Sequence, residues 1–177
     1  MTDDLTDSGA ISSMRAVAHP ARLRILSLLT ARAMSAAEVA RELDLTHANA
    51  SYHLRVLLDA GQLVVASEER IRGGVAKRYR HPWEQQPGRT SGTWDAEGRI
   101  RWTQAMSTEL VRRVHGSTRR HGLFTDAELW VGEEDFAAVQ ELLGQASTLL
   151  HAAARPPRTE GNIKVAMTAA LFEMDPS

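Results

Sequence analysis

The chain has 177 residues, of which 43% are hydrophobic and 24% are charged, as in ordinary folded proteins of one or two small domains. It contains no cysteine, which excludes disulfides, thiolate metal sites and a cysteine nucleophile. No apolar run approaches the about 20 residues needed to cross a bilayer, and the acidic N-terminus lacks the basic start of a secretory signal. These features favour a cytoplasmic protein with no membrane partner.

The net charge of -1 conceals an uneven distribution of charge along the chain. Residues 15–89 carry 12 Arg and Lys against 7 Asp and Glu, whereas residues 90–177 carry 9 against 12. A basic part beside an acidic remainder is typical of a protein that meets a polyanion with one part only, although chance segregation of surface charge gives the same pattern.

Composition along the chain predicts four parts. Residues 1–12 form a polar, flexible tail, and residues 13–82 form a compact domain that is rich in helix signals. A polar stretch rich in Pro, Gly, Ser and Thr makes residues 83–93 a linker. Residues 94–177 are then a second unit, with a role in dimerisation or effector binding.

The compact domain opens with two predicted helices. The first begins at Pro20, because proline is tolerated in a first turn, and His19 is placed to cap or pack against this start. Ser35 and Glu38 have the spacing of a capping box, in which each side chain satisfies the other's free backbone N–H. This spacing predicts a short second helix over residues 36–43.

A third helix follows a tight turn at residues 44–45. Thr46 is a good N-cap for it and Gly61 a natural C-terminal stop, so that the pair of helices describes a helix-turn-helix. On a helical wheel its apolar face holds Ala50, Leu54, Leu57 and Leu58. The opposite face holds Ala48, Asn49, Tyr52, Val56 and Asp59, with Ser51, His53 and Arg55 at the flanks.

A basic β-hairpin is predicted directly after the helix-turn-helix. Residues 63–69 and 75–80 read as its strands, and residues 70–74, which end in Gly-Gly, read as the turn. Its tip and return strand carry Arg70, Arg72, Lys77, Arg78 and Arg80. Such a hairpin is a wing, whose cationic side chains would neutralise phosphates of the DNA backbone.

Residues 19–26 (HPARLRIL), 50–57 (ASYHLRVL) and 60–64 (AGQLV) together resemble the ArsR-like winged-helix regulators of prokaryotes. The resemblance covers residues 13–82, which is under half of the chain. It implies a homodimeric repressor that binds a palindromic operator and releases it on a signal. It also implies that the helix from His47 reads bases, that the wing contacts DNA, and that His53 occupies a position which in the family often touches phosphate.

The chain departs from the metal-sensing members of that family. Their cysteine-containing motif is replaced by residues 36–40 (AAEVA), and the other family site, built from Asp and His on a last helix, would here rely on His115 and His121. Histidines six residues apart do not stack on one helix face. We therefore expect no metal and no cofactor, with a metal-responsive repressor using histidine and carboxylate ligands as an alternative.

The second unit has a mixed pattern. Apolar residues at helical spacing predict a helix over residues 94–121, and residues 126–131 and 163–172 alternate as strands on either side of a helix that begins near Gly132. Two strands are marginal by themselves. We expect two chains to complete this strand-helix-strand unit, with the helix over residues 94–114 as the main dimer contact.

Four tryptophans lie in or beside the second unit, namely Trp83, Trp94, Trp102 and Trp130. They could line an apolar pocket for a small-molecule effector, but large aromatic residues more often belong to a core or a dimer interface. No motif places Ser117, His115, His121 and Asp126 in a hydrolytic arrangement, so we expect no enzyme.

The sequence therefore predicts a mainly α fold with a small β part (α+β): a winged helix-turn-helix, a long helix and a small strand-helix-strand unit. The predicted function is sequence-specific binding of double-stranded DNA, with a winged-helix protein-interaction module as the alternative. Asn49 and Tyr52 are predicted to contact base edges. The remaining predicted DNA-binding residues are Thr46, His47, Ala48, Ser51, His53 and Arg55 on the helix and Arg70, Arg72, Lys77 and Arg78 on the wing.

Overall fold

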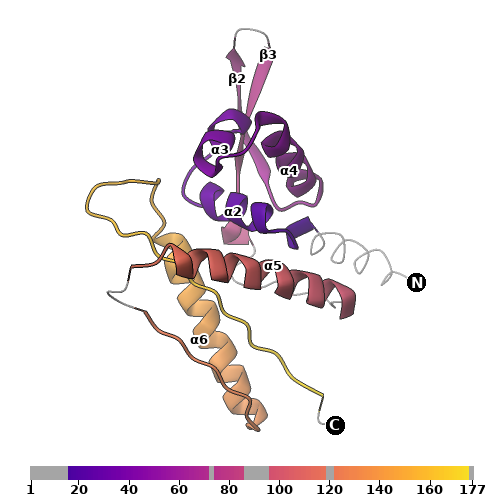
Figure 1. The fold of residues 1–177 in the computed structure, drawn as a ribbon, viewed down its shortest axis with the longest axis vertical. Coiled ribbons are helices and arrows are strands. Elements are labelled where there is room, and N and C mark those ends of the chain that lie inside the picture. The colour runs from indigo at the N-terminus through magenta and orange to yellow at the C-terminus, as the bar shows by residue number, and fades with distance from the viewer. Residues whose placement is uncertain (1–15, 72–73, 86–95, 119–121, 176–177) are drawn as a thin grey trace.

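The computed structural model describes residues 16–71, 74–85, 96–118 and 122–175 (Figure 1). The predicted tail, residues 86–93 of the linker, Arg72, Trp94 and His121 lie outside the described residues. The described part has the predicted α+β composition, with five complete α-helices and a three-stranded antiparallel sheet. The elements are α2 (Pro20–Leu29), β1 (Met34–Ser35), α3 (Ala36–Leu43), α4 (His47–Asp59), β2 (Val64–Ile71), β3 (Gly74–Arg80), the 3-10 helix η1 (Trp83–Gln85), α5 (Ala96–His115) and α6 (Glu133–Ala152).

The ends of the first helices are set by local hydrogen bonds, as the sequence predicts. The Ala21 backbone N–H donates to His19 Nδ1 at 3.1 Å, which caps α2. The Ser35 N–H donates to Glu38 Oε2 at 2.7 Å and the Glu38 N–H donates to Ser35 Oγ at 3.3 Å, which completes the capping box of α3. Asp44 then turns the chain in the left-handed region, with φ of 54°, so that α4 can begin three residues later.

The termini of α4 follow the same logic. The Asn49 N–H donates to Thr46 Oγ1 at 3.2 Å, so that Thr46 is the N-cap. Gly61 lies just beyond the helix with φ of +69°, a conformation that glycine adopts at little steric cost. The predicted helix-turn-helix is therefore confirmed in its order and in its caps.

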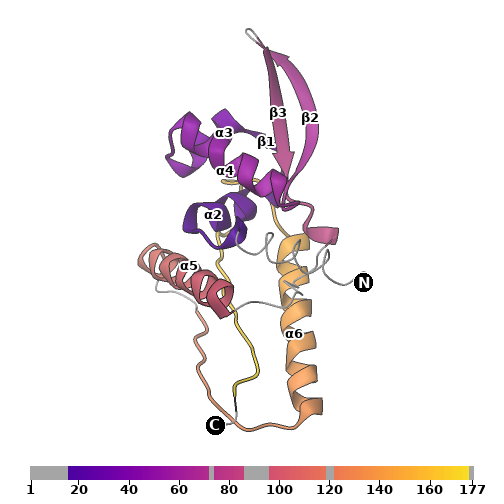
Figure 2. The same cartoon turned by 90° about the vertical axis from the view of Figure 1, so that its right-hand side faces the viewer.

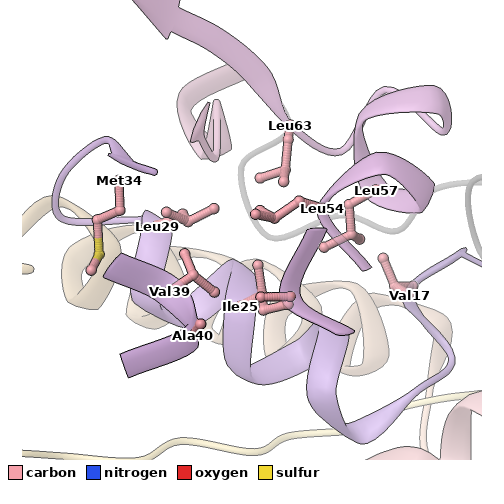
Figure 3. Packing of buried hydrophobic residues seen from close by; sticks show 10 residues of the cluster. Val17, Ile25, Leu29, Met34, Val39, Ala40, Leu54, Leu57 and Leu63 are labelled. Carbon is pink, nitrogen blue, oxygen red and sulfur yellow. The ribbon is translucent and has the colours of Figure 1, made fainter. Parts of the chain in front are cut away.

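One apolar cluster holds the N-terminal half together (Figure 3). Every helix of the helix-turn-helix contributes to it, and Met34 and Leu63 close it from the chain segments on either side of α3 and α4. Its buried members are Val17, Ile25, Leu29, Met34, Val39, Ala40, Ala50, Leu54, Leu57 and Leu63. Because Ala50, Leu54 and Leu57 are fully buried, the face of α4 that the helical wheel assigned to the core is the face that packs.

The wing is a twisted hairpin joined to the helices by a third strand that the sequence analysis did not predict. The strand order is β1-β3-β2, and Tyr79 of β3 pairs with Met34 on one side and with Val65 on the other. A shift in register between Val65 and Ser67 interrupts the β2–β3 ladder, and such bulges increase strand twist. Figure 2 shows the hairpin extending away from the helices.

The C-terminal half departs from the prediction. Helix α5 ends at His115 rather than near residue 121, and one of its faces packs on α2 through Trp102, Ala105 and neighbouring residues. The predicted strands at residues 126–131 and 163–172 were wrong for the isolated chain, because both segments are extended without belonging to a ladder in the described structure. A strand needs a partner for its backbone groups, and within one chain neither segment has one.

Within the described residues, no helix combines the length and the hydrophobicity that crossing a membrane requires.

The packing predicts a sharp contrast between two identical substitutions. Val39 is fully buried in the cluster, whereas Val75 on the wing is 56% exposed. Val39→Ala should lower the free energy of unfolding by about 2 kcal/mol through lost burial and a residual cavity. Val75→Ala should change it by less than about 0.5 kcal/mol. Urea unfolding followed by far-UV circular dichroism measures both, and equal effects would contradict the proposed core.

Candidate nucleic-acid interface

The N-terminal half of α4 presents a continuous exposed surface of small and polar side chains. Its apolar face lies in the core, and the capped first turn therefore projects outward, so that residues 46–49 are all exposed. The exposed residues that the sequence assigns to this surface are Thr46, His47, Ala48, Asn49, Tyr52 and Arg55, and Ser51 is half-buried beside them. Tyr52 keeps 56% of its surface exposed, so its hydroxyl and ring are accessible to a ligand. A helix of this kind has the shape and the donors to enter a major groove.

His53 is placed differently from the prediction. The wheel put it at the flank of α4, but it is buried at 5% exposure, because α2 covers that side of the helix. Its ring lies 4.7 Å from the ring of His19 and 5.3 Å from that of Tyr52. Its Nδ1 atom is buried, and no described residue forms a hydrogen bond with it. His53 therefore supports α4 from beneath instead of facing outward.

Burial also sets the protonation of this histidine pair. Desolvation lowers the pKa of His53 below its ordinary value of 6.5, and the nearby charges of His19 and Arg22 lower it further. Desolvation followed by the charge of Arg22 lowers the pKa of His19 in the same direction. Both shifts disfavour the protonated form of these imidazoles in the folded protein.

The wing carries fewer unpaired cations than its sequence implies. Lys77 Nζ lies 3.8 Å from Glu68 Oε1, and Arg80 Nη1 lies 2.6 Å from Glu84 Oε1. Arg70, near the end of β2, is exposed, and no described residue forms an ion pair with it. Of the wing residues predicted to bind phosphate, Arg70 is therefore the described one that is most available for a polyanion.

Arg78 braces the wing against the helix-turn-helix. Its guanidinium donates to the Ala33 carbonyl oxygen at 3.0 Å and to Glu38 Oε1 at 3.1 Å, and it approaches Glu69 Oε2 at 4.0 Å. Burial by itself would raise the pKa of Glu38, but its hydrogen bonds from Ser35 and Arg78 outweigh that effect and lower it. The Arg78 guanidinium, which the sequence predicted to contact the DNA backbone, is thus already bound to groups of the protein.

Two contacts missed by the sequence analysis join the C-terminal half to α3 and to η1, which follows the wing. Arg158 Nη1 lies 3.0 Å from Glu42 Oε1 on α3, and the Trp83 ring lies 5.6 Å from the ring of His151 on α6. The hydrogen bond from Arg158 lowers the pKa of Glu42. Partners so far apart in the chain leave no local signal in the sequence.

The described tryptophans occupy three different environments. Trp102 packs against the apolar cluster, Trp83 stacks near His151, and Trp130 is 88% exposed. The described residues also contain no group of three or more His, Asp or Glu side chains that could hold a metal ion.

The role of Arg78 generates a first prediction for this surface. Arg78→Ala should lower the free energy of unfolding by roughly 2 kcal/mol, because it leaves the partly buried Glu38 carboxylate without its charged partner. Lys77→Ala is the matched control on the same strand, and it should cost less than about 1 kcal/mol because its ion pair is half-exposed. Urea unfolding measures both variants, and equal losses would show that Arg78 does not brace the wing.

The histidine pair generates a second prediction. Because the folded pKa values of His19 and His53 lie below 6.5, the unfolded chain binds more protons, and stability should fall as the pH drops below about 6.5. His53→Leu should make this pH dependence shallower, and so should His19→Asn, which keeps a side chain able to cap α2. Urea unfolding at pH 7.5 and pH 5.5 tests this, and an unchanged difference in both variants would refute it.

Comparison with known protein families matches a helix-turn-helix domain to residues 17–65, which span α2, α3, α4 and the start of β2. The match covers less than half of the chain. A search of curated proteins found no match. The family match agrees with the exposed face of α4 and points to a regulator rather than to an enzyme. The match identifies residues 17–65 as a helix-turn-helix domain, and it supports a role of this chain in DNA-binding regulation.

Proposed function

We propose that this protein is a homodimeric, ArsR-like winged-helix regulator that represses transcription from a palindromic operator and releases it on a signal. The observation that carries the proposal is the exposed, capped N-terminal half of α4, whose opposite face is locked into the core. The wing follows it directly in the chain and extends beyond α3 and α4 (Figure 1). This combination supports insertion of α4 into a major groove with the wing against the adjacent backbone.

The proposed roles along α4 follow from exposure. Asn49 and Tyr52 reach base edges, and the Asn49 amide can form the bidentate contact with adenine that is typical of asparagine. The remaining exposed or half-exposed positions orient the helix on the backbone: Thr46, His47, Ala48, Ser51 and Arg55. His53 acts from within the core by holding α4 against His19 of the α2 cap.

On the wing we assign phosphate contacts to Arg70, Arg72 and Lys77. Arg78 instead holds the wing at its angle to α3 through Glu38. Lys77 would leave its half-exposed ion pair with Glu68 and bind a phosphate instead, and the loss of that ion pair would cost little stability. The phosphate contacts raise affinity for all sequences and make binding sensitive to salt.

The dimer and the operator are linked by geometry. One chain supplies one recognition helix, so two chains are needed to read two half-sites, which should be about one helical turn apart or a multiple of it. Residues 94–177 are the proposed dimerisation and effector domain, and residues 13–82 the DNA-binding domain. The contacts Arg158–Glu42 and Trp83–His151 would link a signal received by the former to the latter.

One observation favours a second candidate, a winged-helix protein-interaction module. Glu68 and Glu69 place carboxylates on the same hairpin as the cations, and one of them pairs with Lys77. A mixed surface of this kind also suits a protein partner. The two candidates differ in their response to the loss of Arg70. This loss should weaken binding of DNA, whereas it should have little effect on binding of a protein that contacts the whole wing.

Fluorescence anisotropy with duplex DNA from upstream of the protein's own gene, beside a scrambled duplex at physiological salt, tests the proposal. A preference of about 1,000-fold or more for the native duplex is expected of a specific regulator. Asn49→Ala should cost about 10- to 100-fold on the native duplex and change the base preference at one position. Arg70→Ala should weaken both duplexes alike and reduce the salt dependence by about one phosphate contact.

Arg155→Ala is the control, because Arg155 is exposed outside the winged domain and should not alter binding. The opposite pattern, with uniform weakening by Asn49→Ala and altered preference by Arg70→Ala, would overturn the assignment of roles. Absence of binding to either duplex would replace the regulator by the protein-interaction module.

A further inference from the structure

The C-terminal half exposes apolar side chains on a scale that the winged domain does not. Among the large hydrophobic residues that are exposed in the described part of the chain, only Tyr52, Val64 and Val75 precede residue 100, and the other 19 run from Ile100 to Met174. Trp130 is 88% exposed and Leu123 is 90% exposed. Contiguous exposed apolar surface marks a site that another molecule covers.

Helix α6 does not pack its apolar face into a core within one chain. It has 20 residues and an apolar stripe that includes Val139, Leu142, Leu149 and Leu150, yet it buries none of its side chains. Helices in proteins gain most of their stability from packing an apolar face. In a single chain this face of α6 meets water, so its stability requires a partner.

The segments on either side of α6 lack backbone partners. Residues 123–131 and 163–174 are extended, and none of their backbone groups pairs with a backbone group of another described residue. The chain is nevertheless tethered there, since Arg113 of α5 donates to Thr168 Oγ1 at 3.0 Å. Residues 163–170 alternate apolar residues with polar or small ones, residues 123–131 include the apolar runs 123–124 and 129–131, and both segments are drawn as coil in Figures 1 and 2.

We propose that a second copy of this chain covers α6 and that residues 126–131 and 163–172 of the two copies pair into one intermolecular β-sheet. This inference rests on the proposed homodimer and locates its interface. Each chain contributes two strands, which are marginal by themselves, and the pair of chains supplies four with a helix from each copy to cover them. The helix contact predicted over residues 94–114 is then secondary, because one face of α5 is already used by α2.

The exposed area supports a partner of this size. A compact monomer of 19.5 kDa exposes about 8,500 Å², whereas this chain exposes 13474 Å². Each partner of a large permanent interface buries about 1,000–2,500 Å², so the excess is more than enough surface for one such interface. A second copy is favoured over another protein because, in a two-fold interface, each segment can pair with the same segment of the other copy.

Charge is consistent with the same occupant. Helix α6 carries four carboxylates and no Arg or Lys, whereas α5 carries four arginines against two glutamates. Any contact of α6 with α5 of a second copy would therefore join opposite charges, although Arg101, Arg112 and Arg113 also pair with glutamates of their own helix. The four carboxylates of α6 are Glu133, Glu134, Asp135 and Glu141.

Hydrogen exchange of the intact wild-type protein tests the sheet directly. In a single chain the amides of residues 126–131 and 163–172 should exchange as in an unstructured peptide, because no backbone bond protects them. In the proposed dimer their exchange should be slowed by roughly 100-fold or more. Sedimentation equilibrium on the same sample should give a dimer at micromolar concentration.

A matched pair of variants identifies the face that is covered. Val165→Asp places a charge among the apolar alternating positions and should convert the dimer into a monomer, while Lys164→Asp, next to it, changes the charge by more but removes no apolar surface. Lys164→Asp should remain dimeric. Unchanged thermal unfolding of the winged domain, together with retained binding to scrambled DNA, shows that a monomeric variant is still folded.

The outcomes separate this inference from the proposed function. A wild-type monomer, or a dimer whose residues 126–131 and 163–172 exchange freely, overturns the intermolecular sheet. Dimerisation that survives Val165→Asp does the same. If the sheet is present but the wild-type protein shows no preference for the native duplex, the inference stands and the proposed repressor fails.

Discussion

The burial of one face of α4 is the constraint on which the DNA-binding surface depends. Leu54 and Leu57 are fully buried against a cluster that includes Ile25 and Val39, so α4 cannot rotate about its axis without exposing these side chains to water. The opposite face, with Asn49 and Tyr52, is outward as a direct consequence. A few fully buried aliphatic side chains, each contributing about 1.5–3 kcal/mol, therefore decide which residues meet the ligand.

Glu38 connects this core to the wing. Its carboxylate accepts from the Ser35 backbone N–H, which begins α3, and also from Arg78 of β3. One side chain thus fixes the start of the first helix of the motif and the root of the hairpin. The angle between wing and α4 follows from this shared contact, which explains why Arg78 is engaged within the protein while Arg70 remains available farther along the wing.

The two halves of the chain differ in how completely a single copy buries their apolar side chains and pairs their backbone groups. The winged domain has a closed core and paired strands, whereas α6 and the two extended segments beside it expose apolar side chains, and those segments have no backbone–backbone hydrogen bond to another described residue. A symmetric dimer would satisfy both requirements together. It would also place two α4 helices on one DNA molecule, so the same interface would serve stability and operator recognition.

The sequence by itself determined the features that depend on near neighbours. The caps at His19, Ser35 and Thr46 and the stop at Gly61 act over one turn of chain, and they predicted the helix-turn-helix in the correct order. The hairpin was predicted from its two strand-like segments and the Gly-Gly turn between them. The helical spacing of the apolar positions likewise predicted which face of α4 is buried.

Only the tertiary structure decided the features that depend on distant partners. His53 is buried because α2 covers it, and Arg78 is a brace because Glu38 lies 40 residues away in sequence but 3.1 Å away in space. The segment over residues 163–172 has the alternation of a strand yet forms none in a single chain, because alternation sets the faces of a strand and cannot supply the neighbour that its backbone requires.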